Sequence, residues 1–212
     1  MFRSRLFLIT PKSYDPTQFG DILEAALSGG DVASLLITGL ADQPDFLRDA
    51  AKALTPIAQK HEVAVMVHND TQAAGYAKAD GVHVDTGAEN LSLAIDSFHP
   101  ERMVGAGGVA SRHNAMTIGE TSADYIFFGR LDLLEHEEAH PKNLAFAEWW
   151  AEVFELPAVA MAGQSSASVD AIGSTGIDFV AVRDYVWTHA NGPQAAIQEA
   201  NEILDRYTIE EQ

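Results

Sequence analysis

Residues 63–84 read VAVMVHNDTQAAGYAKADGVHV. Two short apolar runs, Val63 to His68 and Gly81 to Val84, stand on either side of a segment whose apolar residues recur at helical spacing. Strands that are covered on both faces are continuously apolar, and strands that alternate with helices are typical of a parallel sheet. We therefore expect a strand, a helix that begins near Thr71, and a second strand parallel to the first.

The same alternation continues in both directions along the chain. Together with the two runs above, the following apolar runs are expected to be strands: Arg5 to Thr10, Val32 to Thr38, Val63 to His68, Gly81 to Val84, Arg102 to Ala106, Asp124 to Phe128, Pro157 to Met161 and Ile177 to Val182. Eight strand–helix units in a chain of 212 residues favour a closed (β/α)8 TIM barrel over an open doubly wound sheet. We expect one such α/β domain over residues 1–212.

Apolar residues outside the strands follow the 3.6-residue period of amphipathic helices. One stripe consists of Phe19, Ile22, Leu23, Ala26 and Leu27, and another of Ala196, Ile197, Ala200, Ile203, Leu204 and Tyr207. We expect each stripe to pack against the sheet, and the tail from Thr208 to Gln212 to be a frayed acidic end.

Acidic residues outnumber basic residues by 31 to 13, which gives a formal net charge of −18. A surface of this sign repels nucleic-acid backbones and anionic lipid, so neither nucleic acid nor a membrane is an expected partner. The chain has no cysteine, which excludes disulfides and cysteine nucleophiles. The apolar run Leu6 to Ile9 is too short for a secretory signal, and no run approaches a membrane span. We expect a cytoplasmic protein.

The loops after the seventh and eighth expected strands hold a candidate phosphate site, because these loops commonly bind phosphate in such barrels. Gly163 would allow close backbone approach, and the amides around Gln164 would hold a phosphate at the start of the next helix. Arg183, after the eighth strand, could contact the phosphate with two N–H groups. An ordinary turn, and an Arg183 that simply pairs with Asp184, are the alternatives.

Acidic residues follow the third and fourth expected strands. Asp70 and Asp85 could face each other across neighbouring strand ends, where carboxylate oxygens suit Mg²⁺ with a bound diphosphate. As an alternative, Asp70 could cap the helix that begins near Thr71. His83, in the fourth strand, is more commonly a packed histidine than a base.

Two further segments are functional candidates. A glycine-rich turn after the fifth strand leads to Ser111, at an N-cap position, and to His113. A histidine in the first turn of a helix has a lowered pKa and can move protons as neutral imidazole, although many such histidines are merely solvated. The connection from Gly129 to Lys142 is long, and long loops in compact domains are commonly active-site lids or mobile surface segments.

Taken together, these strand ends resemble those of the thiamine phosphate synthase family over nearly the whole chain. The matching stretches are Leu6 to Thr10, Asn69-Asp70, Ala79 to Val84, Ser111 to His113, Ala123 to Gly129 and Val180 to Val182. The resemblance implies an enzyme that joins hydroxymethylpyrimidine diphosphate to thiazole phosphate and releases diphosphate. It also implies Mg²⁺ on Asp70 and a substrate contact from Asn69. His83 is a further substrate-binding candidate, and we expect a phosphate rim at Gly163, Gln164 and Arg183.

The chain departs from the family pattern at several polar positions. Where the family has a second metal-binding aspartate, this chain has Asn90, so Asp85 and Glu89 are the candidate replacements. The family's glutamine-leucine-arginine-x-lysine clamp for diphosphate is replaced by LITGL at residues 36–40, and its threonine-threonine-lysine site by an acidic stretch before Lys142. Each lost donor can lower the rate on the order of 10²-fold. We therefore expect a divergent member with impaired synthase activity.

Two alternative functions follow from these departures. The thiazole tautomerase branch shares the barrel, lacks the same clamp and resembles this chain at Ser111 and His113, where the histidine would act as general acid and base without a metal. A non-catalytic relative that binds a phosphorylated ligand or a protein partner is the other alternative. The expected ligands are small phosphorylated heterocycles, and a homodimer is an assembly that the sequence leaves open.

Overall fold

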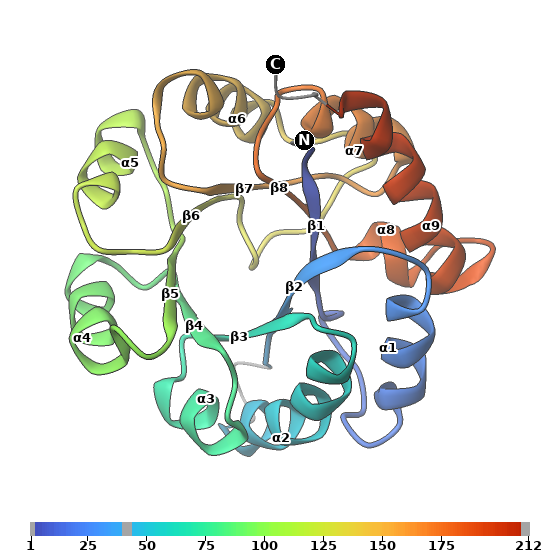
Figure 1. The fold of residues 1–212 in the computed structure, drawn as a ribbon, viewed down its shortest axis with the longest axis horizontal. Helices are drawn as coiled ribbons and strands as arrows, with labels where there is room; N and C mark the ends of the chain where they lie inside the picture. The colour runs from blue at the N-terminus through green and yellow to red at the C-terminus, as the bar shows by residue number, and fades with distance from the viewer. Residues whose placement is uncertain (1–2, 40–43, 209–212) are drawn as a thin grey trace.

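The protein folds as a closed barrel of parallel strands inside a ring of helices (Figure 1). The computed structural model describes residues 3–39 and 44–208. Within these residues the barrel strands are β1 (Arg5–Ile9), β2 (Val32–Ile37), β3 (Ala64–His68), β4 (Gly81–Val84), β5 (Met103–Ala106), β6 (Tyr125–Phe128), β7 (Ala158–Met161) and β8 (Phe179–Val182). Each strand pairs in parallel with the next, and β8 pairs with β1. The predicted (β/α)8 barrel is confirmed.

Helices follow the strands and cover the outside of the barrel (Figure 1). They are α1 (Phe19–Leu27), α2 (Pro44–Lys60), α3 (Thr71–Ala77), α4 (Ala88–Phe98), α5 (Arg112–Gly119), α6 (Pro141–Val153), α7 (Ser166–Gly173), α8 (Asp184–Trp187), α9 (Gly192–Leu204) and the 3₁₀ turn η1 (Asp205–Tyr207). The short helix α8 stands between β8 and the longer helix α9 that packs on the barrel.

The expected and observed strand bounds differ by no more than two residues, mostly where the chain enters a strand. Asp80, Asp124 and Asp178 each precede an even-numbered strand, and each carboxylate accepts a backbone amide at the start of the preceding strand, at 2.6 to 2.8 Å. Two of these aspartates fall inside the strands predicted from the sequence. Their side chains add to the hydrogen bonds that their backbones also make at the amino ends of the strands.

Two apolar clusters stabilise the barrel. The larger one lies between the strands and the surrounding helices. The smaller one fills the inside of the barrel and contains Phe7, Ile9, Leu36, Met66, Tyr125, Phe127, Leu131, Val159, Met161 and Ala181. Leu131 comes from the loop after β6, so this loop contributes to the packing that closes one end of the barrel.

The first predicted helical stripe is buried in α1 except for Ile22, which is 46% exposed because it lies at the edge of the stripe. In α9 the predicted residues from Ala196 to Leu204 are buried. Tyr207 lies beyond this helix in η1, where its hydroxyl donates to Asp170 Oδ1 at 2.9 Å. The two stripes therefore pack as expected, with these two positions at their margins.

The two ends of the described chain meet beside the barrel. Arg3 Nη2 lies 2.9 Å from Asn201 Oδ1, and Arg3 Nη1 lies 3.1 Å from Asp205 Oδ1. Of the predicted acidic tail, all but Thr208 lies outside the described residues. Over residues 3–39 and 44–208, no helix has both the length and the apolar character needed to span a bilayer.

Candidate active site

A cavity of about 720 Å³ opens where the barrel strands end. The last residues or following loops of all eight barrel strands line it, as is usual for active sites in TIM barrels. The loop from Gly129 to Lys142 forms much of the lining, and in Figure 1 this yellow segment bends inward across the barrel. Of the site residues predicted from the sequence, Asp85, Gly163 and Arg183 line the cavity.

His68, Asn69 and Asp85 form a hydrogen-bonded group at the ends of β3 and β4. His68 Nε2 lies 3.0 Å from Asp85 Oδ2, and Asn69 Nδ2 donates to Asp85 Oδ1 at 2.6 Å. The Asp85 amide in turn donates to Asn69 Oδ1 at 3.0 Å. Asn69 has a positive φ of 55°, a conformation that asparagine tolerates better than most residues. These contacts hold the Asp85 carboxylate at the cavity wall.

The Asp85 carboxylate is ionised in this environment. Partial burial by itself raises the pKa of Asp85. Hydrogen bonds from His68 and Asn69, together with the charge on His68, outweigh burial and hold the pKa well below its ordinary value. Asp85 therefore presents a negative charge to the cavity throughout the physiological pH range.

Asp70 caps the helix that follows β3. Its Oδ1 accepts the Ala73 amide at 2.8 Å, and its extended backbone is that of an N-cap residue. Among the described residues its second carboxylate oxygen receives no hydrogen bond. The predicted capping role is therefore confirmed for one carboxylate oxygen of Asp70, and the other oxygen could bind a ligand.

The predicted metal ligands do not gather into one protein-only site. Glu89 is exposed in the first turn of α4, and Asp85 is engaged by His68 and Asn69. The described residues contain no group of three or more His, Cys, Asp or Glu side chains that could hold a metal ion. Mg²⁺ commonly needs only one or two carboxylates together with substrate phosphates. The donor set does not form a three-carboxylate site. Asp70 is not among the residues that line the cavity, and it offers one carboxylate oxygen without a protein hydrogen bond in the described residues, which could hold an ion that substrate phosphates also bind.

His83 lies inside the barrel rather than in the cavity wall. It is fully buried, its ring stacks on that of Tyr125, and its Nδ1 lies 3.0 Å from the Tyr125 hydroxyl. Its Nε2 has no hydrogen-bond partner among the described residues. Burial lowers the pKa of His83 to about 3, assisted by the charge on His68 and opposed by Asp85. His83 is thus a neutral packed imidazole beneath the site.

Ser111 and His113 stand at the start of α5. Ser111 Oγ accepts the Asn114 amide at 3.1 Å, which confirms Ser111 as an N-cap. His113 is exposed, and neither residue lines the cavity. The structure therefore does not bring His113 together with the residues at the barrel mouth.

The backbone amides after β7 are occupied by the loop that follows β6. The Gln164 amide donates to His136 O at 2.8 Å, and the Ser165 amide donates to Glu137 O at 3.1 Å. A Cβ atom added at Gly163 would come within 2.7 Å of backbone oxygens of residues 136–138. Glycine is needed at this position because the two loops are in direct backbone contact.

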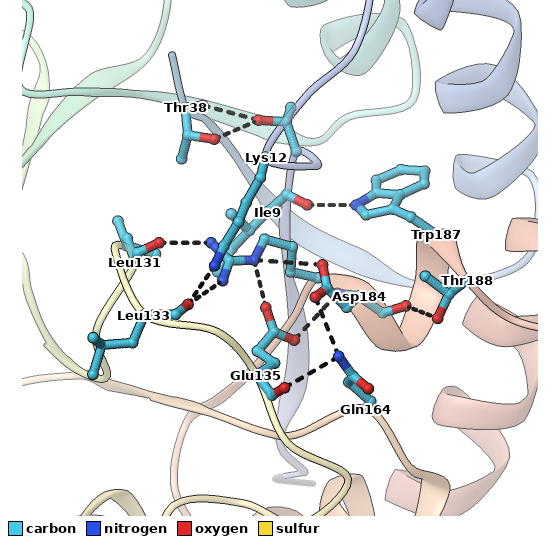
Figure 2. Close-up of polar contacts among 12 residues, drawn as sticks. Ile9, Lys12, Thr38, Leu131, Leu133, Glu135, Gln164, Asp184, Trp187 and Thr188 are labelled. Atoms are coloured by element: carbon cyan, nitrogen blue, oxygen red, sulfur yellow. Dashed lines mark hydrogen bonds and ion pairs between the residues drawn. The ribbon is translucent and has the colours of Figure 1, made fainter. Parts of the chain in front are cut away.

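Arg183 is engaged by the same loop. Its Nε donates to the Glu135 carboxylate, its Nη1 to Leu131 O at 2.9 Å and its Nη2 to Leu133 O at 3.2 Å. Figure 2 shows these oxygens of Leu131, Leu133 and Glu135 converging on one point, with Gln164 and Asp184 beside them. The contact with Asp184 is longer, at 3.8 Å. Asp184, the partner that the predicted alternative gave to Arg183, is thus a secondary partner, and Glu135 is the main one.

Sequence reasoning assigned no role to three residues of this cavity: Lys12, His68 and Glu135. Lys12, in the loop after β1, lines the cavity, and its Nζ donates to Leu133 O at 2.5 Å. His68 ends the third strand, so its position beside Asn69 was a usable signal. Glu135 lies 48 residues from Arg183 in the sequence, and no local pattern indicates that pairing.

Comparisons with known proteins agree on one family. A family model described as thiamine monophosphate synthase matches residues 6–186. The chain is 37% identical over 211 residues to a thiamine-phosphate synthase of Rhodospirillum centenum, covering 94% of this chain and 97% of that protein. It is 34% identical to the thiamine-phosphate synthase of Hyphomonas neptunium, over 96% of this chain and 95% of that protein.

A solved structure resembles the same barrel. The thiamine phosphate pyrophosphorylase of Pyrococcus furiosus superposes with a TM-score of 0.78 at 21% sequence identity, over 95% of this chain and 96% of that one. At this level of identity the likeness supports the fold.

Proposed function

Because the chain belongs to the thiamine monophosphate synthase family, we propose that it is a transferase that joins hydroxymethylpyrimidine diphosphate to thiazole phosphate. The reaction breaks the bond between the pyrimidine methylene carbon and the diphosphate oxygen. It forms a bond from that carbon to the thiazole nitrogen, and diphosphate leaves. The observation that carries the proposal is the full-length similarity to relatives named thiamine-phosphate synthase.

The cavity supports this reaction by its size and position. Its volume of about 720 Å³ lies within the range of ordinary ligand sites, and it is open at the end of the barrel where such enzymes act. Asp85, whose carboxylate is held by Asn69, stands on its β3–β4 side, and Gly163 and Arg183 stand on its β7–β8 side. This proposal puts the two heterocycles between Asp85 on one side of the cavity and the phosphate rim at Gly163 and Arg183 on the other.

The leaving diphosphate needs positive charge, and the chain lacks the family's clamp after β2. Three cationic side chains line the cavity outside the buried rim: Lys12, Arg130 and Lys142. Lys142 Nζ donates to Ala110 O at 2.6 Å, which holds the ammonium group at the β5 side of the mouth. We assign Lys12 and Lys142 to the charge that develops on the diphosphate as it leaves.

Mg²⁺ is part of this proposal, and Asp70 would be its protein ligand, with diphosphate oxygens and water as further ligands. When bound, the ion would neutralise charge on the leaving diphosphate. Asp85, kept ionised by His68 and Asn69, accepts hydrogen bonds from N–H donors of a bound heterocycle.

The alternative functions gain no support. The relatives are named synthases, and His113, the base of the tautomerase alternative, is exposed and away from the cavity lining. No contact of His113 with the cavity lining therefore supports the tautomerase alternative.

Diphosphate release tests the proposal. Purified protein with both phosphorylated substrates and Mg²⁺ should release diphosphate in proportion to enzyme, and omission of thiazole phosphate should abolish release. Absence of release at high enzyme concentration would exclude the synthase reaction.

A further inference from the structure

We propose that Glu135, with the segment Leu131–Glu138, occupies the phosphate position of the β7–β8 rim and that Glu135 determines how far the site prefers a phosphorylated thiazole over a non-phosphorylated one. The inference rests on the proposed function, because it takes this rim as the place of the thiazole phosphate. It goes further by naming a residue of this chain that competes with the substrate for the same donors.

In the described residues the Gly163 amide donates to Ser168 Oγ at 2.9 Å, and the donors of Gln164, Ser165, Arg183 and Asp184 are paired with oxygen atoms of the segment. The Arg183 guanidinium donates to the Glu135 carboxylate and to two backbone carbonyls. The amides of Gln164 and Ser165 donate to backbone carbonyls of the segment. The Asp184 amide donates to Glu135 Oε2 at 3.2 Å. A carboxylate and several carbonyls thus make the contacts that the oxygen atoms of a phosphate would make.

The pairing is buried. The side chains of Arg183 and Glu135 are 1% and 5% exposed, and Leu131 from the same segment packs into the apolar cluster inside the barrel. A buried ion pair whose hydrogen bonds are complete is costly to break, because removal of one partner leaves the other charge without compensation. The segment is therefore built into the rim and is more than a loose surface loop resting on it.

Sterics prevent a phosphate and the segment from sharing the rim. The backbone oxygens of residues 136–138 lie so close to Gly163 that an added Cβ would be 2.4 to 2.7 Å from them. A phosphate group can therefore reach the backbone at Gly163 only if residues 136–138 move away, and it can reach Arg183 only by displacing the Glu135 carboxylate. Because the carboxylate is tethered, it competes at a high effective concentration.

This competition affects one class of ligand. A phosphorylated thiazole must replace the Glu135 carboxylate at Arg183 with its own phosphate group. A thiazole that carries only a hydroxyl group needs no contact with Arg183. Neutralising Glu135 removes the competing charge and leaves the buried Arg183 in need of an anion. The affinity for the phosphorylated ligand should then rise selectively.

Calorimetry with the two ligands tests the proposal. Glu135→Gln should lower the Kd of thiazole phosphate by about tenfold and leave the Kd of the thiazole alcohol within about twofold. Glu137→Gln is the matched control, since it removes the same charge from an exposed side chain whose contacts with the rim are through its backbone carbonyl. Equal effects of the two substitutions, or an equal effect of Glu135→Gln on both ligands, would overturn the proposal.

A second measurement needs no substitution. Thiazole phosphate should accelerate hydrogen exchange in residues 131–138 of the unmodified protein, because the segment leaves the rim, and thiazole alcohol should not. Slower exchange in this segment with the phosphorylated ligand would contradict the inference. Both tests measure binding alone. If the protein distinguishes thiazole phosphate from thiazole alcohol as expected but releases no diphosphate, the proposed function is wrong and this inference still holds.

Discussion

At the scale of single residues, Asp70 combines two tasks whose requirements can be separated. One carboxylate oxygen caps α3, and the other is assigned to Mg²⁺. Asparagine is as good an N-cap as aspartate, but its neutral amide is a poor ligand for Mg²⁺. The two tasks therefore respond differently to the same substitution.

We expect Asp70→Asn to lower kcat/KM for diphosphate release by on the order of 10²-fold, with thermal stability unchanged. Asp70→Ala should lose the same activity and also about 1 kcal/mol of stability through the lost cap. Steady-state kinetics across a Mg²⁺ titration, together with urea unfolding, would check both variants. Full activity in Asp70→Asn would rule out this residue as the metal ligand.

His83 makes the stability of the fold depend on pH. Its pKa is about 3 in the folded protein and near 6.5 when exposed. The unfolded chain therefore takes up a proton first as the pH falls below about 6.5, and the folded state loses stability down to about pH 3, by up to about 1.4 kcal/mol per pH unit. Asp85 has a depressed pKa and adds its own loss only below about pH 4.

Urea unfolding between pH 7 and pH 4.5 should show this loss in the unmodified protein. His83→Gln cannot titrate but can still hydrogen-bond the Tyr125 hydroxyl, so its unfolding free energy should fall less steeply over the same interval. An identical pH slope in both proteins would show that another group is responsible.

Individual residues also show which contacts of the site could be predicted from the sequence and which could not. The capping roles of Asp70 and Ser111 could be predicted because a cap acts within four residues of itself. The pairing of Arg183 with Glu135 could not, because it joins loops that only the closed barrel brings together. Asp70 and Asp85 were proposed as metal ligands from strand position, and Glu89 from its place beside Asn90 in the family pattern. Such positions bring backbones near each other but leave the side-chain directions open.

At the scale of elements, the strands were predictable and the path of the loop after β6 was not. Continuous apolar runs identified the strands because the helices and the barrel interior cover both faces. The loop was recognised as a functional candidate by its length, but many of its contacts use backbone carbonyls. Backbone carbonyl groups are the same in every sequence, so no pattern of residue types predicts where such a loop packs.

Gly163→Ala should loosen this loop. The new methyl group would collide with backbone oxygens at 2.4 to 2.7 Å, so residues 131–138 must move away from β7. Limited proteolysis should then cut within the loop much faster than in the unmodified protein.

Gly75→Ala is the matched control, because its methyl group would meet a flexible arginine at an ordinary 3.5 Å. It lies inside α3, where alanine should add roughly 0.5–1 kcal/mol of stability. Equal protease resistance of the loop in both variants would show that Gly163 does not govern its position.

At the scale of the whole molecule, the interior cluster gives the barrel much of its stability. Phe127 is 1% exposed and packs against Phe7 and His83 inside the barrel. Phe127→Ala should lower the unfolding free energy by about 3–5 kcal/mol, because the neighbouring strands cannot collapse into the space. Leu93→Ala, on the exposed face of α4 at 60% exposure, should change it by less than about 0.5 kcal/mol. Urea unfolding would compare them, and similar losses would contradict this role for the interior.

The closed barrel itself was within reach of the sequence, since a chain of this length with eight strand–helix units has few other ways to cover every strand. The net charge of −18 was less informative about the site. It led us to expect no polyanionic partner, yet lysine and arginine side chains line the cavity where an anionic substrate is expected.

The junction of Arg3 with Asn201 and Asp205 has a consequence for how the chain could be rearranged. Because Arg3 already contacts Asn201 and Asp205, with side-chain atoms 2.9 and 3.1 Å apart, a short linker between the first and last described segments could join them without disturbing β1 or α9. New ends could then be opened at an exposed turn on the far side of the ring. A circularly permuted version should thus fold into the same barrel, in which a different pair of neighbouring strands is the first and the last of the chain.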